Sequence, residues 1–318
     1  MKNWRLQERH SFAITPHVAG LMDHDDHSCP IRRQMIPDLS EWDSAGGFPD
    51  PLKEGVHSPV PGIVHVYPDR VAVIVTGKCA TRCRFCLRRW MLTEPDLDGE
   101  RLDRVIGYLR ENVEIRDVLL TGGDPFMLDD QIIENLLVKF RAIPHIDIIR
   151  FGTRTISTLP HRITDDLVRM IAQFHSVWVN TQFNHPKEVN EESARAVDCL
   201  LGYGIPVGNQ SVLLRGVNDD PDVMLELVRK LVKIRVRPYY LYQAQNLKGT
   251  EHFIVPIEKG LELLKKLRGF TTGFAVPQYV LDTPYGKVPL NNLYHEGRDG
   301  DYFIVKSYCG NTWREYNP

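Results

Sequence analysis

Residues 71–86 read VAVIVTGKCATRCRFC and place three closely spaced cysteines soon after a run of small apolar residues. A short apolar run rich in valine predicts a strand buried in a parallel sheet. Cys79, Cys83 and Cys86 then lie in the loop that follows the carboxyl end of that strand. In barrels of parallel strands, this is the end at which loops bind ligands. The stretch therefore predicts a class of fold and the place of a functional site.

Short apolar runs recur beyond this strand at intervals of about 30 residues, the stride of a strand–helix unit. The strands are expected at residues 71–75, 117–120, 146–149, 177–179, 205–207 and 238–241. Between them, 132–140 and 224–231 carry apolar stripes at helical spacing, and Thr164 before two aspartates suits a helix start. We therefore expect an α/β fold, a partial (β/α)6 TIM-like barrel with helices outside. A complete eight-unit barrel is the alternative, because 278–281 could add a strand.

Composition divides the chain into three segments. Residues 1–70 are irregular and rich in Pro and Gly, and we expect them to wrap the barrel with a short helical stretch and no core of their own. Residues 71–270 carry the strand–helix units, and residues 271–318 form a C-terminal segment. The 318 residues are 42% hydrophobic and 25% charged, which is ordinary for a globular protein.

Charge and hydropathy exclude two classes of partner. The 39 Lys and Arg nearly balance the 41 Asp and Glu, so no basic field argues for nucleic acid. No run approaches the roughly 20 apolar residues of a membrane helix, and the first twelve residues lack the apolar core of a signal peptide. We expect a cytoplasmic protein that binds neither nucleic acid nor membrane.

The three clustered cysteines have the spacing C-x3-C-x2-C. Thiolates suit iron–sulfur clusters or zinc. A zinc site would need a fourth ligand, such as a distant His or Cys199, and three unrelated core cysteines are a further alternative. A cubane cluster on three cysteines leaves one iron open for another ligand, whereas an electron carrier normally has a fourth cysteine. The scattered Cys29, Cys199 and Cys309 are expected to be small buried apolar residues.

A second unusual loop follows the strand at 117–120. Thr121, Gly122, Gly123 and Asp124 precede a proline there, and glycines let the backbone approach a ligand closely. An acceptor beside them can bind an ammonium group. Both loops follow strands at the same end of the sheet, so they are expected to share one site.

Together these motifs resemble the radical S-adenosylmethionine superfamily, including the aromatic residue before the last cysteine. Longer segments look like lysine 2,3-aminomutase and its relatives over nearly the whole chain. These segments are SPVPG at 58–62, YPDR at 67–70, FNHP at 183–186, GNQSVLLRGVN at 208–218, RVRPYY at 235–240, and Asp282 followed by GKVP at 286–289. The resemblance implies a [4Fe–4S] cluster on Cys79, Cys83 and Cys86 whose open iron binds S-adenosylmethionine and yields a 5′-deoxyadenosyl radical.

The resemblance also implies pyridoxal 5′-phosphate, held as a Schiff base on Lys287 with Arg70 near its phosphate. Arg88 would bind the carboxylate of an amino acid substrate. Thr121, Gln182 and Gln210 would lie near S-adenosylmethionine, with Gly122, Gly123 and Asp124 forming the motif for its amino group. The implied reaction is a 2,3-aminomutation that converts an L-α-amino acid into a β-amino acid. An elimination or epimerisation with the same cofactors is the alternative.

Several positions depart from the lysine-specific pattern. Of the two aspartates expected against the substrate ammonium, one matches Asp282 and the other has become Gln245, which predicts a substrate with one cationic or polar group other than lysine. Gln182 replaces a histidine near the adenosyl group, and Val66 replaces an arginine of the phosphate region. Asp220 replaces a zinc-binding cysteine, so a zinc-stapled tetramer is not expected, while a homodimer is compatible with the sequence. An electron donor such as flavodoxin or ferredoxin is the expected partner.

Overall fold

One nine-stranded sheet forms the body of the protein, and its strands follow one another in sequence order from β1 to β9. The computed structural model describes residues 11–317 except 43–45, 292–293 and 308. The strands are β1 (Ile63–Tyr67), β2 (Arg70–Thr76), β3 (Asp117–Gly122), β4 (Ile148–Gly152), β5 (Val177–Thr181), β6 (Val207–Leu213), β7 (Arg237–Gln243), β8 (Gln278–Thr283) and β9 (Gly286–Pro289). Strands β2 to β8 run parallel, while the edge strands β1 and β9 are antiparallel to their neighbours.

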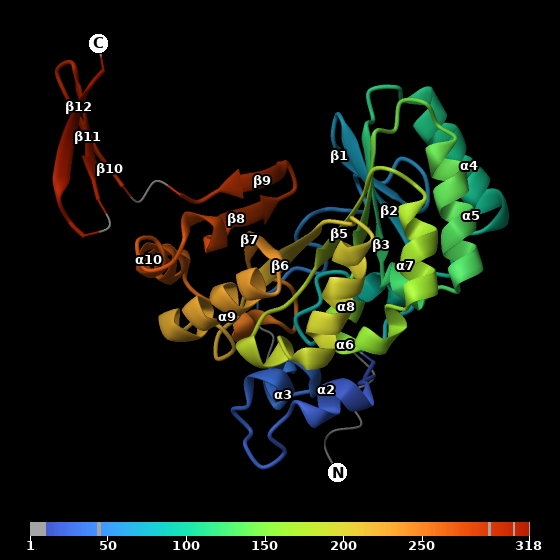
Figure 1. The fold of residues 1–318 in the computed structure, drawn as a ribbon, viewed down its shortest axis with the longest axis horizontal. Coiled ribbons are helices and arrows are strands. Elements are labelled where there is room, and N and C mark those ends of the chain that lie inside the picture. The colour runs from blue at the N-terminus through green and yellow to red at the C-terminus, as the bar shows by residue number, and fades with distance from the viewer. Residues whose placement is uncertain (1–10, 43–45, 292–293, 308, 318) are drawn as a thin grey trace.

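Helices connect the parallel strands and cover the outer face of the curled sheet (Figure 1). They are α4 (Gly99–Glu111), α5 (Asp130–Arg141), α6 (Thr155–Thr158), α7 (Asp165–Ala172), α8 (Glu191–Gly202), α9 (Pro221–Lys233) and α10 (Ile257–Leu267). The six units from β2–α4 to β7–α10 confirm the predicted partial (β/α)6 barrel, and β8 adds a seventh parallel strand at the expected 278–281. The eight-unit alternative is wrong, because the described sheet ends in an antiparallel strand on each side.

Side chains along the strands alternate between the apolar core and the interior of the barrel. In β2, Val71, Val73 and Val75 are buried in the main apolar cluster, which also takes the apolar stripes of α5 and α9. Arg70 and Ala72, on the other face of the strand, line a cavity inside the barrel, which Val71 also borders. Thr164 caps α7 as predicted, because its side chain accepts a hydrogen bond from the amide of Leu167.

Several strand boundaries and several strands differ from expectation. Strand β4 begins at Ile148 rather than Ile146, and β6 runs from Val207 to Leu213 rather than ending at 207. Polar residues continue β6 because alternate side chains face the cavity and need not be apolar. The two antiparallel edge strands were not predicted: β1 pairs with β2 through a hairpin, and β9 pairs with β8.

The N-terminal segment has a small core, contrary to expectation. Helices α2 (Pro16–Gly20) and α3 (Pro30–Met35) lie at the end of the barrel where α6 and α8 are found, and α2 contacts α6 (Figure 1). Five buried residues form their own apolar cluster: Val18, Met22, Cys29, Ile31 and Met35. This core was not predicted, because its apolar residues are spread over two short helices and the segment around them with no sustained period. The first ten residues, which include most of the segment predicted to lack a signal peptide, lie outside the described residues.

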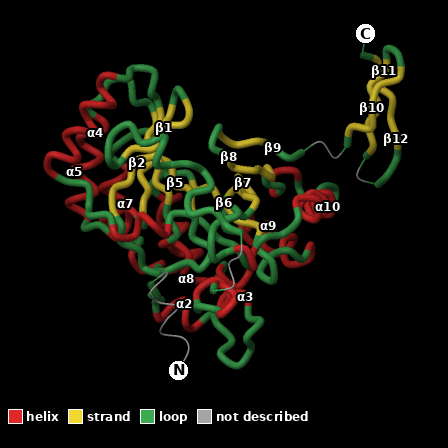
Figure 2. The backbone as a smooth tube through the Cα atoms, turned by 180° about the vertical axis from the view of Figure 1, so that it is seen from behind, coloured by secondary structure: helices red, strands yellow, loops and turns green. Residues whose placement is uncertain are grey.

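The C-terminal segment contributes β8 and β9 to the main sheet, and its last three strands form a separate antiparallel sheet that stands away from the barrel in both views (Figures 1 and 2). The strands of this separate sheet are β10 (His295–Asp299), β11 (Tyr302–Lys306) and β12 (Thr312–Tyr316). Cys309 is exposed in the turn between β11 and β12, so the prediction that it is buried was wrong. Within the described residues, no helix is both long and apolar enough to cross a membrane.

Candidate active site

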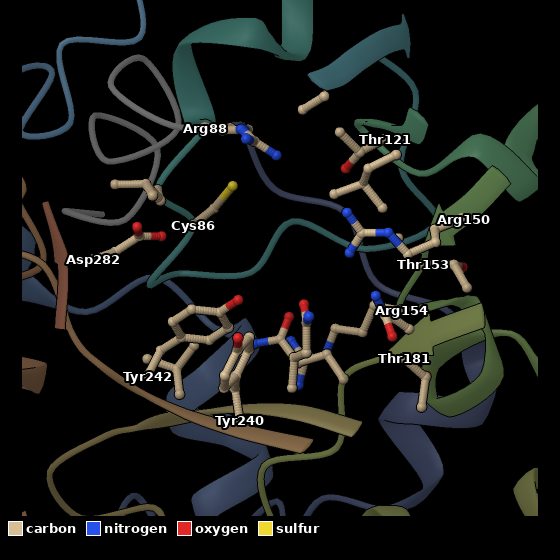
Figure 3. A pocket seen from close by; sticks show the side chains of 18 of the residues that line it. Cys86, Arg88, Thr121, Arg150, Thr153, Arg154, Thr181, Tyr240, Tyr242 and Asp282 are labelled. Carbon is tan, nitrogen blue, oxygen red and sulfur yellow. The ribbon is translucent and has the colours of Figure 1, made fainter. Parts of the chain in front are cut away.

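A cavity of about 1040 Å³ opens inside the barrel and at the carboxyl ends of its strands. Every residue that the sequence analysis placed in the site lines this cavity: Arg70, Cys79, Cys83, Cys86, Arg88, Thr121, Gly122, Gly123, Asp124, Gln182, Gln210, Gln245, Asp282 and Lys287. Cys86, Arg88 and Asp282 project into it from one side, and Thr121 and Arg154 from the other (Figure 3). Positions spread over more than two hundred residues thus meet in one space.

The three clustered cysteines follow β2 and are only partly buried as residues. Burial of the sulfur raises the pKa of the Cys86 thiol to about 11, and burial also raises the pKa of the Cys79 thiol. Among the described residues, no three His, Cys, Asp or Glu side chains converge to hold a single metal ion. A cubane cluster binds each of its cysteines to a different iron, so its ligands need not converge on one point.

The glycines of the second loop allow two backbones to touch. A Cβ atom on Gly122 would lie 2.4 Å from the carbonyl oxygen of Thr76, and one on Gly123 would lie 2.1 Å from that of Lys78. The amide of Gly123 donates a hydrogen bond to the Thr76 carbonyl at 2.6 Å. Only glycine fits at this approach. The second loop is therefore locked onto the segment that leads into the cysteines.

Lys287 and Asp282 lie opposite each other on the antiparallel pair β8–β9. The Lys287 Nζ is 3.6 Å from the Asp282 Oδ2, and both side chains are partly exposed to the cavity. Burial raises the pKa of the Asp282 carboxyl, while the cations of Lys287 and Arg88 oppose that rise. The Gln245 Nε2 donates to the Asp282 backbone carbonyl at 2.9 Å, which ties this amide to the residue that carries the carboxylate.

Arg88 is held in place by a carboxylate that the sequence analysis did not identify. Glu54 accepts hydrogen bonds from the Arg88 Nε and Nη2, the shortest at 2.7 Å, and its side chain is only 5% exposed. Burial alone would lower the pKa of the Arg88 guanidinium, but the carboxylates of Glu54 and Asp282 outweigh it and raise the pKa. Arg88 is thus a fixed cation on the wall of the cavity.

The edge strands β1 and β9 approach each other beside Lys287. The Tyr67 hydroxyl accepts a hydrogen bond from the Lys287 backbone amide at 2.6 Å, and the Arg70 guanidinium lies 3.8 Å from the centre of the Tyr67 ring. Gly286 adopts a positive φ of 110°, and a Cβ there would come within 3.0 Å of the same ring. The Lys287 Nζ lies 5.7 Å from the ring centres of Tyr67 and Tyr242. These contacts fix the turn that carries the lysine.

Comparison with known proteins agrees with this geometry. The family model described as Radical SAM superfamily matches residues 73–228. L-lysine 2,3-aminomutase from Clostridium subterminale is 48% identical over 303 residues, which are 94% of this chain and 73% of that protein. Glutamate 2,3-aminomutase from Clostridioides difficile (strain 630) is 42% identical, over 94% of this chain and 72% of that protein. The chain belongs to the lysine 2,3-aminomutase family.

Solved structures support the fold of this aminomutase. A radical SAM methyltransferase from Sphaerobacter thermophilus superposes with a TM-score of 0.52 at 22% identity, over 69% of this chain and 68% of that one. As a member of its family, the chain is an isomerase that uses radical S-adenosylmethionine chemistry. The three cysteine thiols that line the cavity fit a [4Fe–4S] cluster. When bound, the cluster and S-adenosylmethionine supply the radical.

One predicted role in the aminomutase site is not supported by the hydrogen bonds. The Asp124 carboxylate is buried and accepts from four donors: the Thr153 hydroxyl and the amides of Phe126, Arg154 and Thr155. Two carboxylate oxygens offer about four acceptor sites, so little capacity remains for an ammonium group. Asp124 braces the loop, and the backbone around it is the better candidate for binding a ligand.

Four residues near the aminomutase site escaped the sequence analysis: Glu54, Tyr67, Arg154 and Tyr242. Arg154 lies just beyond β4, at the strand end where ligands bind, and that position could have identified it. Glu54 and Tyr67 come from the segment expected only to wrap the barrel; Tyr67 begins the YPDR segment of the resemblance, which assigned it no role, and no local signal marks Glu54. Their roles follow from contacts across distant parts of the chain.

Proposed function

We propose that this chain is a pyridoxal 5′-phosphate-dependent 2,3-aminomutase acting on an amino acid other than lysine whose side chain carries one cationic or polar group. The observation that carries the proposal is the placement of Arg88, Asp282 and Lys287 around the cavity that the cluster cysteines also line. One substrate in the cavity is thus within reach of all three: Lys287 would hold the cofactor, Arg88 would bind the substrate carboxylate, and Asp282 would bind its side chain.

Lys287 suits the attachment of an aldehyde cofactor. Its amine reaches the cavity, and its backbone is held by Tyr67, which also stacks on Arg70. Arg70 is a cation on the same wall and could pair with a phosphate group. Pyridoxal 5′-phosphate, when bound, supplies electron delocalisation for the migrating nitrogen. Lys287 holds and releases the cofactor, and Tyr67 keeps its backbone in place.

The charges near Arg88 support a substrate with one side-chain cation or dipole. Glu54 already pairs with Arg88, which leaves Asp282 as the carboxylate beside Lys287 for a distal group. Gln245 offers an amide at the neighbouring place, already hydrogen-bonded to the Asp282 backbone. A lysine ammonium would have one full anion there and one dipole, a weaker environment than two anions. The orientation of the substrate by these residues contributes to the rate.

The test is anaerobic reconstitution with iron, sulfide and pyridoxal 5′-phosphate, followed by incubation with S-adenosylmethionine, a reductant and single amino acids. We expect β-amino acid products by mass spectrometry, and a cofactor absorbance band that Lys287→Ala abolishes while the exposed-site control Lys265→Ala keeps it. Absence of the band would contradict the cofactor. A kcat/KM for L-lysine at least equal to that for every other amino acid would contradict the substrate assignment.

A second outcome, elimination or epimerisation with the same cofactors, is kept open by Gln245, because this amide changes how the distal end of the substrate is held. It is recognised in the same assay by ammonia release or by a D-amino acid without β-amino acid.

We also propose an electron donor of the flavodoxin or ferredoxin class and a homodimeric assembly. Asp220 supports the expectation that no zinc ion links the subunits, because its carboxylate caps α9 by accepting hydrogen bonds from the amides of Asp222 and Val223. Sedimentation with and without a chelator tests this assembly, and a chelator-sensitive tetramer would contradict it.

A further inference from the structure

Arg154 is a buried cation that touches a cluster cysteine. The residue is 8% exposed and follows β4, and its side chain lies on the wall of the cavity (Figure 3). The Nη1 donates to the Cys83 Sγ at 2.7 Å. The Nη2 donates to the Glu188 Oε1 and the Gln34 Oε1, both at 2.6 Å. The guanidinium therefore bridges the cysteine loop and a carboxylate behind it.

Both ends of Arg154 are fixed by other parts of the fold. Its backbone amide donates to the Asp124 Oδ2 at 2.7 Å, which ties it to the second loop. Glu188 is 2% exposed, and its other oxygen accepts from the backbone amides of Asn184 and His185. The acid cannot swing toward the cysteines without losing these bonds. The positive group faces the sulfur, and the negative group lies behind it.

We infer that Arg154 is a positioning residue that raises the reduction potential of the cluster held by Cys79, Cys83 and Cys86. Reduction adds one electron from an external one-electron donor to the cluster, with no bond made or broken at Arg154. A nearby cation that donates a hydrogen bond to a ligand sulfur stabilises the added negative charge. Solvent screens the charge of Arg154 poorly, because the guanidinium and its carboxylate partner Glu188 are both buried. The inference rests on these cysteines holding the cluster.

If Arg154 acts through its charge, the direction in which each of two variants shifts the reduction potential can be predicted. Removing the charge of Glu188 alone leaves the guanidinium uncompensated, so the potential should rise. Removing both charges takes away the cation that lies nearer to the sulfur, so the potential should fall. If Arg154 only supported the fold, the two variants would not be expected to shift the reduction potential in opposite directions.

The experiment uses the reconstituted full chain, titrated with dithionite and followed by electron paramagnetic resonance without S-adenosylmethionine. For Arg154→Met/Glu188→Gln, we expect at least a tenfold lower reduced-to-oxidised ratio at a fixed potential, which is about 59 mV for one electron. Glu188→Gln should shift the midpoint upward. Arg169→Met, at an exposed helix position, is the control and should leave the midpoint unchanged.

Iron and sulfide contents are measured in parallel for each variant. If the double variant fails to retain its cluster, Glu188→Gln decides alone: an upward shift supports the inference, and an unchanged or lower midpoint overturns it. Shifts of the same sign in both variants also overturn it. An unchanged midpoint together with weaker S-adenosylmethionine binding would assign Arg154 to the ligand instead, and would overturn the inference as well.

Discussion

Replacing Arg84 should destabilise the protein far more than replacing an arginine on its surface. Arg84 lies between two cluster cysteines, is completely buried, and turns its side chain toward the N-terminal segment. Its Nε and Nη2 donate to the two oxygens of Glu41 at 2.8 and 2.6 Å, and its Nη1 donates to the Ser11 carbonyl at 3.1 Å. Arg84→Met would leave the Glu41 carboxylate buried without its cation.

The structure sets the size of this effect. Breaking a buried ion pair by removing one partner costs about 3–5 kcal/mol. Glu41 keeps one hydrogen bond from the Asp38 amide, at 3.2 Å, so the lower end of that range applies. We expect a loss of about 3 kcal/mol in the free energy of unfolding. With a urea slope of about 3 kcal/mol/M, the midpoint should fall by about 1 M.

The matched control is Arg169→Met. Arg169 also contacts two carboxylates, but its side chain is 56% exposed, and such surface pairs contribute about 1 kcal/mol or less. Anaerobic urea unfolding followed by tryptophan fluorescence measures both variants. Arg84→Met/Glu41→Leu should recover more than half of the loss, because it removes both charges. A loss below about 1 kcal/mol for Arg84→Met, or no recovery in the double variant, would refute the reasoning.

Other predictions test the loop, a cap and a histidine. Gly123→Ala should sharply reduce the iron retained after reconstitution, since its Cβ would lie 2.1 Å from the Lys78 carbonyl oxygen; retention equal to wild type by iron analysis contradicts this. Thr164→Ala should cost about 1 kcal/mol in urea unfolding by removing a helix cap, whereas Thr164→Ser should not. Burial, followed by the charge of Lys187, lowers the pKa of His185 to about 4. The unfolded state therefore binds more protons between pH 6.5 and 4, and stability should fall as the pH falls through this window. His185→Asn should flatten that dependence, and an unchanged slope in thermal unfolding would disprove it.

The periodic part of the fold was predictable from sequence because buried strands and amphipathic helices repeat in a regular order. The apolar face of β2 and the stripes of α5 and α9 identified the barrel directly. The cysteines and glycines of the site were also predictable, because cluster ligation and the close approach at Gly123 demand particular residue types. The position of Lys287 came from the family resemblance, since nothing local distinguishes one lysine from another.

What escaped prediction depends on contacts between distant segments. Glu54 reaches Arg88 across 34 residues, and Tyr67 reaches Lys287 across 220 residues. The role of Asp124 was misjudged because its four donors become visible only when the loops after β3 and β4 are brought together. The separate sheet of β10 to β12 gave no signal, because its short strands are largely exposed and lack a buried face.

The antiparallel edges of the sheet have a mechanical consequence for Lys287. Its strand, β9, is bonded to β8 on one side, and its contact with β1 includes a hydrogen bond from the Lys287 amide to the Tyr67 hydroxyl. Such a bond contributes only about 1 kcal/mol net. Lys287 is therefore held by fewer backbone pairings than the cysteines, which follow a strand paired on both sides. Local opening at the β9 edge should therefore cost less free energy than opening of the strand that leads to the cysteines.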